Sequence, residues 1–189
     1  MFRFDDILEH WAEIYKPISH SPDPTQKHTA FYRINTINAD STFVRNFAQA
    51  CSPAMAYATL VDAHQQENNT VVYTHTVYFL VKQKSQGMGT TAVQDDMEAT
   101  ECKYMANQYV LDLLAFLRQM KTKTQRGELK DKEAARCLRG FNLDTAEWAT
   151  IPVKYNGWWI CGLTLEQTVT EPQCIVSERY NKDVSTMFL

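Results

Sequence analysis

The segment from Val71 to Lys82 restricts the possible folds more than any other part of the chain. It is rich in β-branched and aromatic residues, which favour strands, and side chains alternate between the two faces of a strand. One face would carry Tyr73, His75, Val77, Phe79 and Val81, and the other Val72, Thr74, Thr76, Tyr78 and Leu80. Because both faces are largely apolar or β-branched, we expect a strand that is central in a sheet or covered on both sides.

A second strong pattern predicts a long helix from about Gln94 to Lys121. Acidic residues at its start and basic residues at its end complement the helix dipole. At about 1.5 Å per residue the helix would span about 40 Å, enough to lie along a whole sheet. The apolar stripe at helical spacing consists of Met97, Tyr104, Met105, Tyr109, Leu113, Phe116, Leu117 and Met120.

Weaker patterns place the remaining elements. We expect helices at Asp5–Tyr15, from Asp40 to Ala50 and within Glu128–Arg139, and extended segments at Ala30–Ile37, Met55–Val61, Phe141–Val153 and Trp159–Val169. His64–Thr70 reads as a polar turn and Asn156-Gly157 as a hairpin turn. Strands clustered in pairs around one helix favour an α+β fold, a mixed or antiparallel sheet with the long helix packed on one face. We expect one domain over residues 1–171 and a C-terminal arm over 172–189.

The charge balance argues against a generic nucleic-acid-binding protein. The 189 residues include 19 basic and 22 acidic side chains, a net charge of −3, whereas proteins that bind phosphate backbones usually carry a basic excess. The N-terminus lacks the features of a signal peptide, and no stretch approaches the length of an apolar spanning helix. We therefore expect a protein made in a cytoplasm, with its five cysteines as thiols and with neither a membrane nor a specific nucleic acid as partner.

One glycine-rich segment, Gly87-Met88-Gly89-Thr90-Thr91-Ala92, fits a variant of the dinucleotide-binding fingerprint. That motif needs a tight turn directly after a buried strand. Here a polar spacer precedes the glycines, and no parallel strand with an acidic end follows about 20 residues on. The context favours a strand-to-helix loop. A nucleotide- or phosphate-binding enzyme that uses the Gly87–Ala92 loop is the alternative.

The histidines, cysteines and serines predict no catalytic, cofactor or metal site. No two histidines have the i, i+4 spacing of helical zinc ligands, and neither a C-x-x-C pair nor a G-x-S-x-G turn is present. His75 lies among apolar residues, where a hydrogen-bonded interior or interface histidine is expected. His20 and His28 flank a proline-containing loop and are expected to be solvated. The acidic pair Glu98 and Glu101 is explained by the helix dipole.

Aromatic residues gather around the last hairpin and indicate a protein–protein interface. Trp158 and Trp159 are neighbours on a strand, so they must point to opposite faces. The chain ends in three apolar residues, which suit an arm that docks on a partner. The candidate interface residues are Trp148, Tyr155, Trp158, Trp159, Met187, Phe188 and Leu189. The basic cluster between Arg118 and Arg139 contains interspersed acidic residues, as on a solvated helical face, but it could face an acidic protein partner.

The order of these features resembles that of small neck and tail-completion proteins (tail terminators) of tailed bacteriophages, especially phages of Bacteroidetes. The resemblance covers about residues 5 to 170. It includes the N-terminal helix Ile7–Tyr15, the loop His20–Lys27 with Phe31-Tyr32, the strand Val71–Val81, the helix Asp95–Met120, the segment Phe141-Asn142-Leu143-Asp144 and the closing hairpin around Gly157 and Trp159–Leu165. The Glu128–Arg139 insert and the long C-terminal tail depart from the pattern.

The resemblance implies a non-enzymatic virion protein with an α+β sheet that carries its helices on one face. Such subunits form homo-oligomeric rings, commonly hexamers, at the head-proximal end of the tail tube, and related rings are connectors in crAss-like phages. The implied partners are further copies of the chain and neighbouring portal, connector or tail proteins, without a cofactor. The implied location is the neck or tail of the virion. A host-interacting binding module that uses the same aromatic surface remains an alternative, beside the nucleotide- or phosphate-binding enzyme.

Overall fold

A computed structural model of the chain has the strand β4 (Thr70–Lys82) at the centre of a six-stranded sheet. On one side β4 pairs along its whole length with β6 (Trp158–Thr170). On the other side it pairs with β2 (Ala54–Ala58) and then with β3 (Asp62–Gln66). The expectation of a central strand is confirmed, and its physical cause is that Phe79 and Leu80, on opposite faces, are both almost fully buried.

The structure describes residues 4–23, 28–34, 51–59, 62–66, 70–84, 92–152 and 158–170. Three expected features lie outside the described residues. They are the helix from Asp40 to Ala50, the turn at Asn156-Gly157 and the C-terminal arm 172–189.

The sheet is mixed, with the strand order β1-β2-β4-β6-β5 and with β3 paired to β4. β1 (Phe31–Ile34) runs parallel to β2, whereas β5 (Phe141–Pro152) runs antiparallel to β6. The expected polar turn over His64–Thr70 is wrong in its first part, because the chain continues as β3 to Gln66. β3 pairs with β4 through backbone hydrogen bonds. Its side chains can therefore remain polar and exposed at the edge of the sheet.

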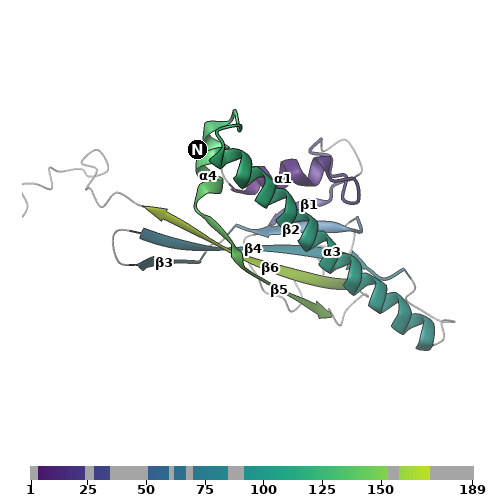
Figure 1. The fold of residues 1–189 in the computed structure, drawn as a ribbon. Helices are drawn as coiled ribbons and strands as arrows, with labels where there is room; N and C mark the ends of the chain where they lie inside the picture. Colours follow the sequence, from purple (N-terminus) through teal and green to yellow (C-terminus); the bar gives the residue numbers. More distant parts are fainter. Residues whose placement is uncertain are drawn as a thin grey trace, which may run out of the picture.

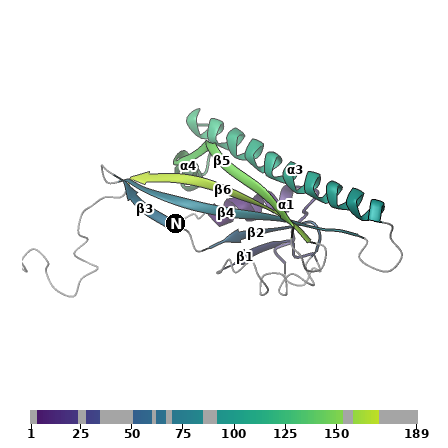
Figure 2. The same ribbon diagram turned by 90° about the horizontal axis from the view of Figure 1, so that it is seen from below.

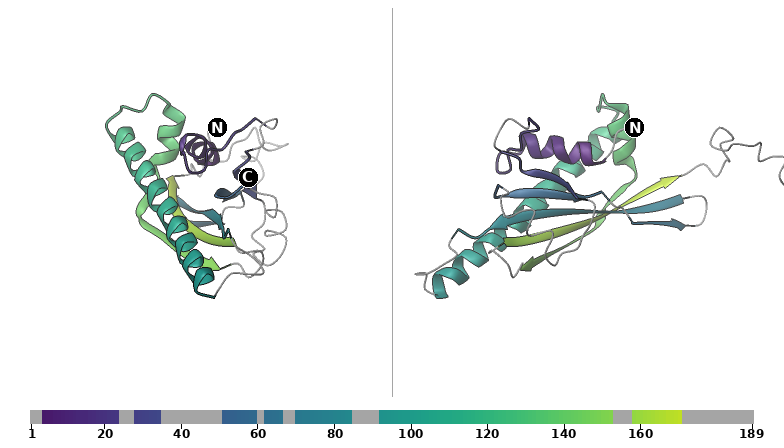
Figure 3. Two further views of the ribbon diagram at one scale, coloured as in Figure 1. Left: turned by 90° about the vertical axis from the view of Figure 1, so that its right-hand side faces the viewer. Right: turned by 180° about the vertical axis from the view of Figure 1, so that it is seen from behind.

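In the described part of the chain, three helices cover one face of the sheet (Figures 1 and 3). They are α1 (Phe4–Ile14), α3 (Ala92–Gln125) and α4 (Lys132–Arg139). α3 confirms the predicted long helix, and α4 confirms the predicted short one. α3 runs along the sheet, and its first turns extend past the ends of β5 and β6 (Figures 1 and 2). The α+β architecture with a long helix packed against a mixed sheet is therefore as the sequence predicted.

The main core lies between these helices and the sheet. Leu8 of α1, Leu113 of α3 and Phe79 of β4 are completely buried in it. Tyr15 follows α1, stacks on Trp11 with ring centroids 4.3 Å apart and hydrogen-bonds to the carboxylate of Asp112 on α3. This polar contact fixes the two helices relative to each other above an apolar layer.

A second, smaller apolar cluster lies on the opposite face of the sheet. Leu80 and Trp158 are almost fully buried there beside the alanines at positions 54 and 56. Small residues on β2 leave room for the large indole and leucine side chains, as expected where side chains pack to high density. Both faces of β4 are thus apolar and covered.

We predict that Gly140→Ala destabilises the fold. Gly140 connects α4 to β5, and a Cβ atom there would lie 2.3 Å from the backbone carbonyl oxygen of Thr168. β6 is held between β4 and β5 and cannot yield easily, so we expect the free energy of unfolding in urea to fall by about 1–3 kcal/mol. The matched control is Gly162→Ala, whose Cβ would meet only the Tyr78 ring at an ordinary 3.4 Å. Equal effects of the two substitutions would contradict this account.

Candidate functional site

Trp148 is an exposed aromatic residue on the edge strand β5. It pairs in register with Leu163 of β6, so the two side chains share the face of the sheet that carries the helices. Leu163 is completely buried, whereas Trp148 is 42% exposed. Of the predicted interface residues that the structure describes, Trp148 is the one that presents most surface to a partner.

Of the two adjacent tryptophans of β6, Trp158 is buried and Trp159 is partly buried. They point to opposite faces, as predicted, because Trp158 pairs with Lys82 and Trp159 with Val81. Trp158 belongs to the smaller cluster and is only 2% exposed. Trp159 packs against the main core, and the Lys103 ammonium lies 4.5 Å from the centre of its ring, within cation–π range. Trp158 therefore serves packing within the chain, and Trp159 packs against the core while part of its surface remains exposed.

The remaining predicted interface residues, Tyr155, Met187, Phe188 and Leu189, lie outside the described residues. The same holds for the glycine-rich segment as far as Thr91. Its last residue, Ala92, is the first residue of α3.

The outward face of α3 is apolar at three positions. Met97, Tyr104 and Leu111 are seven residues apart and are 69%, 69% and 44% exposed. At about 3.6 residues per turn they share one side of the helix, opposite the buried Cys102, Ala106, Tyr109, Leu113 and Leu117. Assigning Met97 and Tyr104 to the same stripe as the buried residues was wrong, because helical spacing alone does not separate two apolar stripes on opposite sides.

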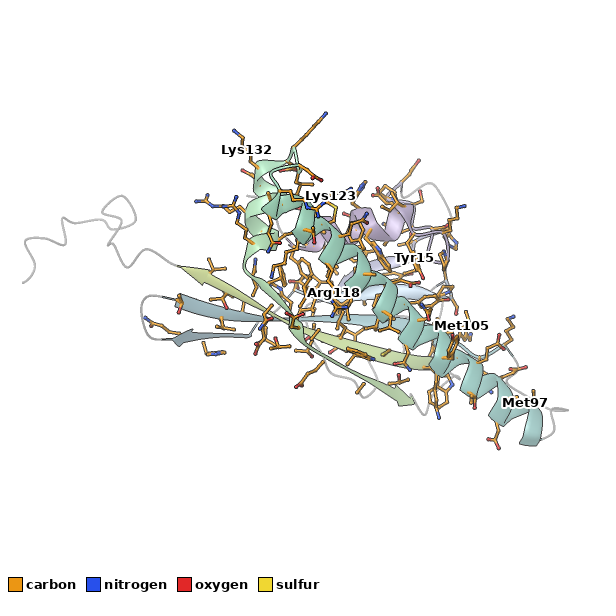
Figure 4. All side chains as sticks on the ribbon, in the orientation of Figure 1. Tyr15, Met97, Met105, Arg118, Lys123 and Lys132 are labelled. Atoms are coloured by element: carbon orange, nitrogen blue, oxygen red, sulfur yellow. The ribbon has the colours of Figure 1, made fainter. Side chains whose placement is uncertain are left out.

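An open hollow lies at the start of this outward face. Its described lining consists of Asp96, Met97, Thr100, Glu101 and Tyr104. Figure 4 shows Met97 near the far end of α3, while Arg118 and Lys123 lie toward the other end of the same helix. The hollow therefore combines an apolar surface with carboxylates, next to a helix end that extends past the sheet.

His75 is the centre of a buried hydrogen-bond chain that links three strands and a helix. Tyr57 Oη lies 2.8 Å from His75 Nδ1, and His75 Nε2 lies 3.0 Å from Gln167 Oε1. The Gln167 side-chain amide donates to the carbonyl oxygen of Cys137 at 2.7 Å. Tyr57 lies on β2, His75 on β4, Gln167 on β6 and Cys137 on α4. The expected hydrogen-bonded interior histidine is confirmed.

The direction of these hydrogen bonds fixes the tautomer of His75. Because the Gln167 Nε2 group donates to a carbonyl, its Oε1 atom must accept, and His75 must carry its proton on Nε2. His75 Nδ1 then accepts from the Tyr57 hydroxyl. Every polar atom of the imidazole has a partner while the ring is neutral.

Aromatic rings enclose this neutral imidazole. The rings of Phe4 and Phe141 have centroids 5.1 Å and 5.2 Å from that of His75. Burial in these surroundings lowers the pKa of His75 below its ordinary value of 6.5, although the Gln167 hydrogen bond acts in the opposite direction. Burial likewise raises the pKa of the Tyr57 hydroxyl. The network is therefore built to stay uncharged.

A charged cluster that the sequence patterns did not indicate attaches α1 to β1. Arg33 Nε lies 2.7 Å from the Asp5 carboxylate, and its Nη2 atom lies 2.9 Å from Glu9 and 3.3 Å from Asp6. The carboxylates of Glu9 and Asp5 raise the pKa of Arg33. The only sequence signal for this site is the spacing that places the carboxylates on one side of a short helix.

His20 also contacts this cluster. Its side chain is buried, so the expectation that it is solvated is wrong. It is 7% exposed, its Nδ1 atom accepts the backbone N–H groups of Ala30 and Phe31, and its Nε2 atom lies 3.6 Å from Glu9. The buried ring replaces backbone hydrogen bonds at the start of β1, a role that loop composition cannot reveal. His28 is exposed, as expected, with its Nε2 atom 3.0 Å from the carbonyl oxygen of Ile18.

None of the described cysteines forms a disulfide, and burial makes several of the thiols weakly acidic. Burial raises the pKa of Cys137 to about 11 and also raises the pKa values of Cys102 and Cys161. Such thiols are poor nucleophiles at neutral pH. Within the described ranges, no three His, Cys, Asp or Glu side chains are arranged to hold a metal ion.

Among the described helices, none is both long and apolar enough to span a lipid bilayer.

Comparison of the chain with protein-family models finds no matching family, and a search of curated proteins finds no significant match.

We predict that His75 makes the stability of the fold depend on pH below about 6.5. There the unfolded chain binds a proton at this position and the folded chain does not, so the free energy of unfolding falls as the pH is lowered. The limit for one group is about 1.4 kcal/mol per pH unit. In urea titrations between pH 7.5 and 5.5, His75→Leu should show a smaller pH slope than the wild type, whatever its overall stability.

The matched control for this prediction is His64→Leu. His64 is exposed on β3, so its replacement should leave the slope of the wild type unchanged. A His75→Leu slope equal to that of the wild type would show that His75 does not carry the pH dependence.

Proposed function

We propose that the chain is a non-enzymatic virion structural protein that forms an oligomeric ring at the neck or tail of a tailed bacteriophage. As a tail terminator or connector, the ring joins head-proximal and tail components. It assembles in the host cytoplasm and mates with neighbouring portal, connector or tail proteins. The observation that carries the proposal is the edge strand β5.

β5 is long, and among the described strands it pairs only with β6. An edge strand presents backbone N–H and C=O groups that another chain can pair with, and proteins usually protect such edges. β5 has a register shift between Asn142 and Glu147, and just after it carries the exposed Trp148 in its ladder with β6. A neighbouring subunit that covers this edge would bury Trp148 and satisfy the free backbone groups together.

The opposite edge of the sheet differs from β5. There β1 is short, runs parallel to β2 and is held by Arg33 against the carboxylates of α1. If β5 of one subunit contacts the β1 edge of the next subunit, the contact joins two unlike surfaces. Such a head-to-tail contact produces a ring when its rotation closes. The unlike edges therefore support a cyclic assembly.

The arrangement of elements adds support from the resemblance to tail terminators. An N-terminal helix, a long central strand, a long helix and a closing pair of strands follow one another in that order. The helices cover one face of the sheet, as the resemblance implies for ring-forming subunits. The enzyme alternative rests on the Gly87–Ala92 loop, of which residues 87–91 lie outside the described residues, and a host-binding module would use the same exposed Trp148. The unlike edges of the sheet favour the ring.

We predict that the purified protein forms rings and that Trp148→Asp abolishes them. A carboxylate at this position cannot be buried against a neighbour without a large desolvation penalty. The measurement is mass in solution by light scattering, combined with negative-stain imaging. Trp148→Phe, which keeps an apolar ring, is the matched control and should retain rings. A wild-type protein that is strictly monomeric, alone and with the products of neighbouring portal and tail genes, would overturn the proposal.

A further inference from the structure

α3 carries a second apolar surface where a helix on a monomer's sheet is normally polar. Three of the five exposed large apolar side chains of the described chain, Met97, Tyr104 and Leu111, lie on its outward face. Ala115, one turn after Leu111, is exposed on the same side. We call the surface formed by Met97, Tyr104, Leu111 and Ala115 the α3 seam. A seven-residue repeat of apolar side chains is the pattern by which two helices pack along their length.

The hollow at the start of the seam carries acidic side chains, whereas the side chains exposed near the end of α3 are basic. Asp96 and Glu101 lie near the start of the seam, in the hollow that Met97 and Tyr104 also line. Lys103 is also exposed near the start, where its ammonium lies over the Trp159 ring. Arg118, Lys123 and Arg126 are exposed near the end of α3. The two groups are roughly 25 to 45 Å apart at about 1.5 Å per residue. At this separation the two groups are screened from each other within one chain. Arg118 also donates to the backbone carbonyl of Leu143.

This charge distribution is complementary to itself in one orientation. A second α3 helix that runs parallel would bring like charges together at both ends. A second α3 helix that runs antiparallel brings the acidic start of each copy against the basic end of the other. The antiparallel arrangement is two-fold symmetric, so the same contact is made twice.

We propose that α3 pairs antiparallel with α3 of a second copy of this chain along the α3 seam. The two-fold axis passes between Gln108 and Leu111. In this register Tyr104 lies opposite Ala115 of the second copy, a large side chain against a small one. Glu101 lies opposite Arg118 of the second copy, and the hollow at the start of the seam receives the basic end. The partner is therefore a second copy, selected by its charge pattern.

The pairing goes beyond the proposed ring and does not depend on it. It uses the outward side of a helix, whereas the proposed ring contact uses the edge of β5. The experiments are therefore done with the full chain and again in the Trp148→Asp background, where the β5 contact is removed. Loss of rings in that background with retention of dimers separates the two contacts.

The first experiment reverses the charges at each end separately. Asp96→Lys with Glu101→Lys makes both ends of the seam basic, and Lys123→Glu with Arg126→Glu makes both ends acidic. We expect each double variant alone to lose the dimer seen in sedimentation, and an equimolar mixture of the two to regain it as a heterodimer. The matched control reverses Lys132 and Arg136, exposed basic residues on α4, and should leave the dimer unchanged.

The second experiment tests the two-fold axis directly. Leu111→Cys lies next to the axis, so a short bifunctional maleimide should join two copies through the same residue. Lys132→Cys, exposed on α4 away from the seam, should give no more covalent dimer than the wild type with its native thiols. Unchanged circular dichroism spectra and unfolding midpoints ensure that each variant is folded.

Three outcomes would overturn the pairing. In the first outcome, the protein in the Trp148→Asp background is monomeric at high protein concentration. In the second, the mixture of charge variants stays monomeric. In the third, Leu111→Cys cross-links no better than Lys132→Cys. A mixture that associates while Leu111→Cys fails to cross-link would indicate a head-to-tail contact in place of the antiparallel one.

Discussion

The burial of both faces of β4 is the constraint on which the rest of the structure depends. Phe79 points toward the helices and Leu80 toward the smaller cluster, and each is almost completely buried. Full burial of one such side chain stabilises a fold by about 1.5–3 kcal/mol, so neither face can be left open to water. β4 therefore needs a strand on each side and a layer on each face. The full-length pairing with β6, the split pairing with β2 and β3, and the position of α3 all meet this need.

α3 is longer than the task of covering β4 requires. Its inward side supplies Val110, Leu113 and Leu117 to the core, while Met97 is exposed in the first turns, which extend past the sheet (Figure 4), and Tyr104 is exposed farther along the helix. A helix that only covers a sheet gains nothing from apolar side chains on its solvent side, which is polar in ordinary amphipathic helices. Exposed apolar patches that carry polar rims are typical of interaction sites. The proposed pairing of α3 with a second copy would cover both the excess length and the second apolar stripe.

The elements with a clear hydrophobic periodicity could be predicted from the sequence. The features that depend on which residues become neighbours in the folded chain could not. β4, β6, α1 and α3 have long, clear patterns, and each lies within a few residues of the expected range. β3 was missed because edge pairing uses backbone groups and leaves His64 and Gln65 exposed. The burial of His20 depends on two backbone N–H groups from a different segment. Trp148 and Trp158 look alike in sequence, and only the tertiary neighbours make one exposed and the other buried.

Hydrogen bonds within the chain hold in place the elements that carry the two proposed contact surfaces. The chain from Tyr57 through His75 and Gln167 to Cys137 ties α4 to three strands. Lys121 and Arg118 of α3 donate to the backbone carbonyls of Phe141 and Leu143 on β5, which fixes the end of the helix against the edge strand. A surface already held in its binding geometry loses less conformational entropy on association. Arg118 contacts β5 and also lies at the end of the α3 seam, so one side chain borders both proposed surfaces.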